Sequence, residues 1–65
     1  MTYAVRKVGE SYTVHCNGKK VYSTKRYESL VRYLRNEVQR RAALGFTTNI
    51  SAQQSIKEDA YSYEY

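Results

Sequence analysis

The chain has 65 residues, 42% of them hydrophobic, and a formal net charge of +5 at pH 7. This length allows one domain at most, the single cysteine excludes an internal disulfide, and no apolar run approaches the ~18 residues of a membrane span. Residues 1–46 carry ten Lys and Arg against three Asp and Glu, which suits an anionic partner: nucleic acid, with duplex DNA favoured, or an acidic protein surface.

Three short runs rich in Val and Tyr alternate in polarity and predict strands at Tyr3–Val8, Tyr12–Cys16 and Lys20–Ser23. Both links between them have the sequence of a two-residue hairpin turn. Asn17-Gly18 predicts a type I′ turn, which needs positive φ at both central residues, and Gly9-Glu10 predicts type II′, with glycine first.

Two-residue turns fix the register of both hairpins, and they align Val5, Val14 and Val21 in one row across the strands. The two faces of the sheet then differ in character. One predicted face carries Tyr3, Val5, Tyr12, Val14, Cys16 and Val21. The other carries Ala4, Arg6, Thr13, His15, Lys20 and Tyr22.

A helix is predicted next, capped by Ser23 or Thr24 and ended by Gly45. Its apolar residues recur at spacings of three and four and match the apolar face of the sheet. They are Tyr27, Leu30, Val31, Leu34, Val38 and Ala42. The sequence therefore predicts an α+β fold, a three-stranded antiparallel β-meander packed on one α-helix, over residues 1–46, with Phe46 tucked against the helix end.

Residues 47–65 are polar, weakly acidic and rich in tyrosine, and they predict a tail or a short docking helix. Ser51 and Gln54 have capping-box spacing, so a helix is expected from about Ala52 to Ala60. Three roles are open for this segment: covering the basic surface, binding a partner, or remaining disordered. Its candidate partner-binding residues are Ile56, Tyr61 and Tyr63.

The sequence offers no set of residues for catalysis. His15 and Cys16 are the only soft metal ligands, and as neighbours on a strand they point to opposite faces, whereas a zinc site needs about four ligands. A glycine-rich phosphate loop and a paired-carboxylate pattern are also missing from the sequence. We therefore expect a protein that is not an enzyme and has no metal and no cofactor.

Two surfaces could bind a partner. The outer face of the helix carries a stripe without an acid, roughly 140° from the apolar stripe: Arg32, Arg35, Asn36, Gln39 and Arg40. The bare face of the sheet carries Arg6, Thr13, His15, Lys20 and Tyr22. Arg, Asn and Gln contact phosphates and base edges, and a basic sheet face with an aromatic ring can enter a major groove or stack exposed bases. The alternative for both surfaces is an ordinary solvated face.

The succession "YAVRKV-GE-SYTVHC-NG-KKVYST" followed by "KRYESLVRYLRNEVQRRAA" resembles the arm-type DNA-binding domain of tyrosine-family integrases. That family has three antiparallel strands and a helix, and its sheet enters the major groove. The resemblance is one of pattern and covers about residues 3–43. It implies that Arg6, Thr13, His15, Lys20 and Tyr22 face DNA, while recombinase activity is not expected because no catalytic domain follows.

These observations predict a small nucleic-acid-binding accessory or regulatory protein of phage or mobile-element type. The alternative is a small inhibitor or adaptor that binds a host protein, such as a nucleic-acid enzyme or a defence factor. It would use its basic helix face, its tyrosines or a sheet edge. The chain start has no signal-type apolar core, so a cytoplasmic location is expected, or the host cytoplasm for a phage protein. A homodimer is left open.

Overall fold

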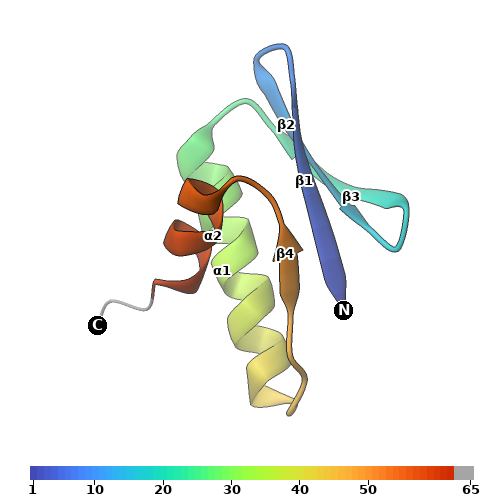
Figure 1. The fold of residues 1–65 in the computed structure, drawn as a ribbon, viewed down its shortest axis with the longest axis vertical. Helices are drawn as coiled ribbons and strands as arrows, with labels where there is room; N and C mark the ends of the chain where they lie inside the picture. Colours follow the sequence, from blue (N-terminus) through green and yellow to red (C-terminus); the bar gives the residue numbers. More distant parts are fainter. Residues whose placement is uncertain (63–65) are drawn as a thin grey trace.

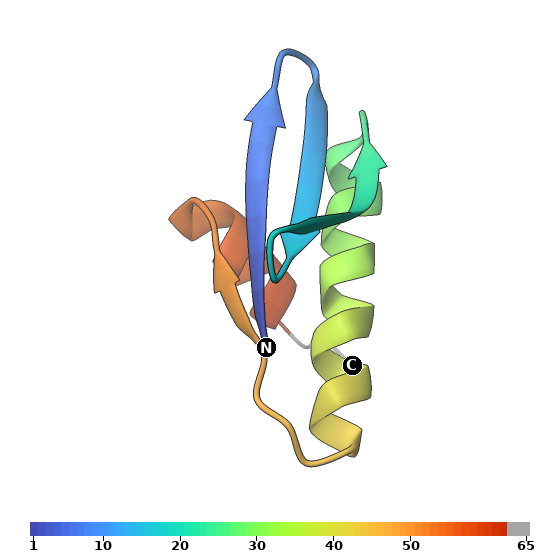
Figure 2. The same cartoon turned by 90° about the vertical axis from the view of Figure 1, so that its right-hand side faces the viewer.

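The computed structural model describes residues 1–62 and has an α+β fold in two layers (Figure 1). The elements in chain order are β1 (Thr2–Val8), β2 (Ser11–Cys16), β3 (Lys19–Thr24), α1 (Tyr27–Ala43), β4 (Asn49–Ser51) and α2 (Gln54–Tyr61). The strands form one sheet in the order β3-β2-β1-β4. Both helices lie behind the sheet in Figure 2, so its other face is open.

The β1-β2 hairpin confirms the predicted register, with Val5 opposite Val14. Gly9 has a φ of 61°, as the first central position of a type II′ turn requires. Asn17 and Gly18 have φ values of 55° and 82°, and the type I′ turn needs positive φ at both positions. Local turn chemistry therefore sets this part of the sheet.

The β2-β3 pairing departs from the prediction at a β-bulge. His15 lies opposite Lys20 as predicted, but the next pair is Val14 with Tyr22, which leaves Val21 as an extra residue in β3. Val21 is 43% exposed, so the prediction of a buried row of three valines is wrong for this member. The bulge moves Tyr22 to the face that packs on the helices.

A tyrosine pair accounts for the bulge. The rings of Tyr22 and Tyr33 are stacked, with 4.2 Å between their centroids and 3° between their planes. A tyrosine ring buries more apolar area than a valine side chain, so this register gains more from the contact with α1. The prediction that Tyr22 lies on the open face beside Arg6 is therefore wrong.

α1 buries Leu30, Leu34 and Val38, as its stripe predicts. It begins at Tyr27, after the predicted caps, and Thr24 only accepts a hydrogen bond on Oγ1 from the backbone N–H of Arg26, at 3.2 Å. No side chain caps its first turn.

The C-terminal end of α1 has the predicted glycine. Gly45 has a φ of 85° and donates its N–H to the carbonyl of Ala42 at 3.0 Å, while Phe46 donates to Arg41 at 2.9 Å. These bonds form a Schellman motif. The turn leads the chain on toward β4 with the Phe46 side chain 64% exposed, so its predicted packing against the helix end is wrong.

The segment after residue 46 contributes to the same core. β4, which the sequence did not predict, pairs in parallel with β1 and places Ile50 opposite Tyr3. α2 confirms the expected second helix and buries Ile56 and Ala60. The expected capping box is absent, because Ser51 belongs to β4 and the helix begins after Gln53 without a side-chain cap.

The core lies between the sheet and the two helices. Its buried apolar residues are Tyr3, Val14, Leu30, Leu34, Val38, Ile50, Ile56 and Ala60. Neither helix in residues 1–62 combines the length and the apolar character that crossing a membrane requires.

Candidate functional site

The open face of the sheet gathers polar side chains from three strands. Arg6 on β1 lies opposite Thr13 on β2, and His15 lies opposite both Ala4 on β1 and Lys20 on β3. Four of the five residues predicted for this face are therefore brought together: Arg6, Thr13, His15 and Lys20. Tyr22, the fifth, is on the other face.

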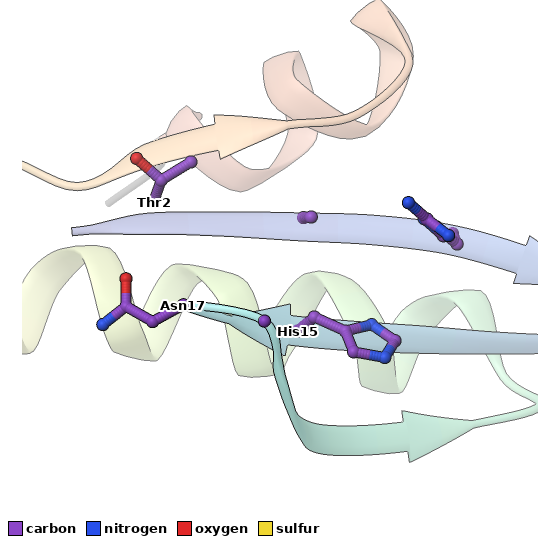
Figure 3. Close-up of a pocket in the computed structure, with 6 residues that line it drawn as sticks. Thr2, His15 and Asn17 are labelled. Atoms are coloured by element: carbon purple, nitrogen blue, oxygen red, sulfur yellow. The ribbon is translucent and has the colours of Figure 1, made fainter.

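A concavity of about 470 Å³ lies at one end of this face. Figure 3 shows Thr2 at the start of β1 and Asn17 in the turn just after β2, on the same side of the sheet as His15. Gly18, Ala4 and Arg6 complete its lining. Thr2 and Asn17 were not singled out from the sequence, although the predicted register already placed them beside the Ala4–His15 pair.

The open face is basic. The four strands contain no Asp or Glu. Arg6 and Lys20 are exposed and make no ion pair within residues 1–62, where both ion pairs join α1 residues to Glu37. His15 is half-buried, and its Nδ1 atom is shielded from solvent without a hydrogen-bond partner. The face thus offers unneutralised charge and an unused polar atom.

The helix stripe differs from its prediction in two ways. Arg35 is not free, because its Nε donates to the backbone carbonyl of Asp59 at 2.7 Å and thereby joins α1 to α2. Arg40 donates to Glu37 at 2.5 Å, so an acid lies within reach of a stripe that the sequence predicted to be free of acids. Both differences arise because long side chains reach partners that a helical wheel does not show.

Four residues of that stripe are exposed as predicted: Arg32, Asn36, Gln39 and Arg40. Two of them are charged, but Arg40 is paired with Glu37, so only Arg32 makes no ion pair in the described part of the chain. One free cation is a weaker anion-binding surface than the sheet face, which has two cations and a histidine.

The candidate residues of the C-terminal segment have structural roles. Ile56 is 6% exposed and belongs to the core. Tyr61 is 38% exposed, and its hydroxyl donates to the backbone carbonyl of Thr48 at 2.7 Å. Tyr63 lies outside the described residues. Ile56 is therefore unavailable to a partner in the folded protein.

A polar network at the end of the core was missed by sequence analysis. The hydroxyl of Tyr3 donates to Glu37 at 3.1 Å and accepts from Arg41 at 2.9 Å. Burial raises the pKa of Tyr3, although its bond to Arg41 opposes this shift. Glu37 and Arg41 are four residues apart on one side of α1, and this spacing is the sequence signal from which their pairing could have been predicted. The network joins the sheet to the helix and faces the core side.

No group of three or more His, Cys, Asp or Glu residues that could hold a metal ion occurs in residues 1–62. Cys16 is half-buried, and its thiol contacts the Met1 sulfur at 3.7 Å. His15 lies on the opposite face of the same strand, as predicted.

The open face of the sheet is therefore the candidate site, and Arg6, Thr13, His15 and Lys20 are its central residues. Comparison with protein-family models, with curated proteins and with solved structures found no match to this chain.

Proposed function

We propose that this chain is a small non-enzymatic protein that binds nucleic acid through the open face of its sheet. It would act as an accessory or regulatory protein of the phage or mobile-element type. The supporting observation is the combination of Arg6, His15 and Lys20 on one exposed face whose strands contain no acid. Phosphates supply most of the electrostatic attraction in such complexes, so unpaired cations on a shared surface favour this partner.

Duplex nucleic acid suits this face better than single strands. Proteins that bind single strands stack bases on aromatic side chains. Here Tyr3, Tyr12 and Tyr22 all pack against the core, so the strands present no tyrosine ring on the open face. Arginine, lysine and threonine can instead donate to phosphates and base edges in a major groove, which admits β-strands.

The test is fluorescence anisotropy with a labelled random-sequence duplex and with one of its strands, at several salt concentrations. Phosphate contacts from Arg6 and Lys20 would give a log–log slope of roughly −2 with duplex. The double variant Arg6→Gln/Lys20→Gln should weaken duplex binding about tenfold or more and reduce that slope by about 2.

The matched control is Lys25→Gln/Arg32→Gln, which removes the same charge from exposed residues outside the sheet. It should leave the slope nearly unchanged. Equal effects of the two double variants would mean that net charge alone, and not the open face, attracts the duplex. Tighter binding to the single strand than to the duplex would contradict the proposed preference for duplex nucleic acid.

A second candidate function rests on a different observation. Leu44 and Phe46, which follow the end of α1 and are two residues apart in the chain, are 69% and 64% exposed, and exposed large apolar side chains are used in protein contacts. An inhibitor or adaptor of a host protein would use them. Its complex should survive nuclease, be lost in Leu44→Ser/Phe46→Ser, and persist in Arg6→Gln/Lys20→Gln. The opposite pattern would favour the nucleic-acid function.

A further inference from the structure

We propose that the concavity beside the Asn17-Gly18 turn is a seat for one phosphodiester group of the nucleic-acid backbone. This inference rests on the proposed function and deepens it, because it assigns one contact of the open face to a defined place. The seat would fix the position of the protein along the backbone, while Thr13 and Lys20 lie on the remaining part of the face.

The lining provides donors from β1, from β2 and from the turn that follows β2. Arg6, His15, Thr2 and Asn17 can all donate hydrogen bonds, and no carboxylate from residues 1–62 lines the concavity. Ala4 is opposite His15, and its small side chain leaves the space between the donors open. An anion can therefore approach the strands closely at this point.

Two nitrogen-bearing side chains of the lining, Arg6 and His15, have hydrogen-bonding groups without a partner in residues 1–62. The Arg6 guanidinium has no ion pair in residues 1–62, and its planar fork can donate two parallel bonds to the two free oxygens of a phosphodiester. His15 has a shielded Nδ1 without a partner. Half a turn of its ring about χ2 would place carbon in that position and direct Nδ1 toward the concavity, where a phosphate oxygen can accept its hydrogen.

A backbone phosphate fits this environment better than an isolated phosphorylated side chain does. The seat opens onto the basic face that includes Thr13 and Lys20. A polymer with a regular row of phosphates can use both the seat and the rest of the face, whereas a phosphopeptide would use the seat alone.

The direct test is an NMR titration of the full chain with dimethyl phosphate, a phosphodiester probe, against potassium chloride at equal ionic strength. Saturable shifts are expected at the Thr2, Asn17 and Gly18 amides and at the His15 ring. Arg6→Gln should weaken this binding about tenfold, as loss of a bidentate charged contact implies, while Arg32→Gln should leave it unchanged. Identical shifts with chloride would overturn the seat.

Inorganic phosphate distinguishes the two sources of the group. Binding of inorganic phosphate without binding of dimethyl phosphate would mean that the site takes a terminal phosphate, and the backbone assignment would be overturned. Binding of both probes at the same residues supports it. Thermal melting of each variant verifies folding, and Arg6 is exposed, so Arg6→Gln should melt like the wild-type chain.

Duplex binding separates failure of the seat from failure of the proposed function. With a duplex, Arg6→Gln should reduce the salt slope by about 0.9, the value for one phosphate contact, and Arg6→Lys should restore it. If the duplex binds but Arg6→Gln leaves both the slope and the His15 signals unchanged, the seat is overturned and the proposed function stands. If no nucleic acid binds while dimethyl phosphate saturates the seat, the proposed function fails and the anion site stands.

Discussion

At the scale of single residues, tyrosine hydroxyls connect the elements of this small protein. The Tyr27 hydroxyl donates to the carboxylate of Asp59 and so joins α1 to α2. Burial raises the pKa of Tyr27 to about 12, and the bond to Asp59 adds to the shift. Burial likewise raises the pKa of Tyr33 to about 12. A tyrosine in an unfolded chain titrates near pH 10, so folding holds protons that the unfolded chain releases.

These shifts predict a loss of stability at high pH. Below pH 10 both states keep the phenolic protons, and the contribution to stability is complete. As the pH rises from about 10 through about 12, the unfolded chain ionises first and the free energy of unfolding falls. The measurement is the urea midpoint between pH 8 and pH 12.

Tyr27→Phe should be less stable than the wild type at pH 8 by about 1 kcal/mol, because it loses the bond to Asp59. Between about pH 10 and 12, however, its free energy of unfolding should fall less than that of the wild type. Tyr12→Phe is the control, because the Tyr12 ring packs edge-on against Tyr27 and its hydroxyl donates to no group in residues 1–62. Parallel pH profiles for wild type and Tyr27→Phe would contradict this account.

At the scale of elements, the sequence predicts what local chemistry determines. The first hairpin, the glycine turns and the buried stripe of α1 follow from turn types and periodicity. The grouping of Arg6, Thr13, His15 and Lys20 follows for the same reason, since these residues lie before the bulge. Tyr22 lies beyond it, and its position depends on a ring in another element. β4 has only three residues, fewer than the roughly four to eight over which alternation predicts a strand.

The bulge can be tested with alanine substitutions at two neighbouring residues of β3. The observed register and the predicted one expect opposite orders for the two losses of stability. Val21 is 43% exposed, so Val21→Ala should cost less than about 0.5 kcal/mol. Tyr22→Ala removes the ring stacked on Tyr33 and should cost about 2 kcal/mol or more, less than a fully buried aromatic residue because Tyr22 is half-buried. Urea denaturation measures both. The register without a bulge predicts the reverse order. A larger loss of stability for Val21→Ala than for Tyr22→Ala would therefore support that register and contradict the bulge.

At the scale of the whole molecule, residues 47–62 complete the core and leave the open face uncovered. Ile50, Ile56 and Ala60 are buried, and both helices occupy the same side of the sheet (Figure 2). The docked α2 therefore does not cover the basic face, which is one of the three roles that the sequence leaves open for the C-terminal segment. Met1 is held against the start of β4, because its ammonium donates to the Thr47 carbonyl at 3.3 Å and its own carbonyl accepts from the backbone N–H of Asn49 at 2.8 Å.

Removal of this segment should consequently unfold the protein. A chain ending at Phe46 loses two buried isoleucines, worth roughly 1.5–3 kcal/mol each, from a domain whose stability is on the order of 5 kcal/mol. It also loses the bonds of Asp59 to Tyr27 and Arg35. We expect no cooperative thermal transition by circular dichroism. A chain ending at Ser62 retains β4 and α2, and it should melt cooperatively near the wild-type temperature. If the free energy of unfolding of the chain ending at Phe46 lies within about 1 kcal/mol of that of the full chain, then β4 and α2 do not stabilise the core. Masking of the basic face by the segment would then again need consideration.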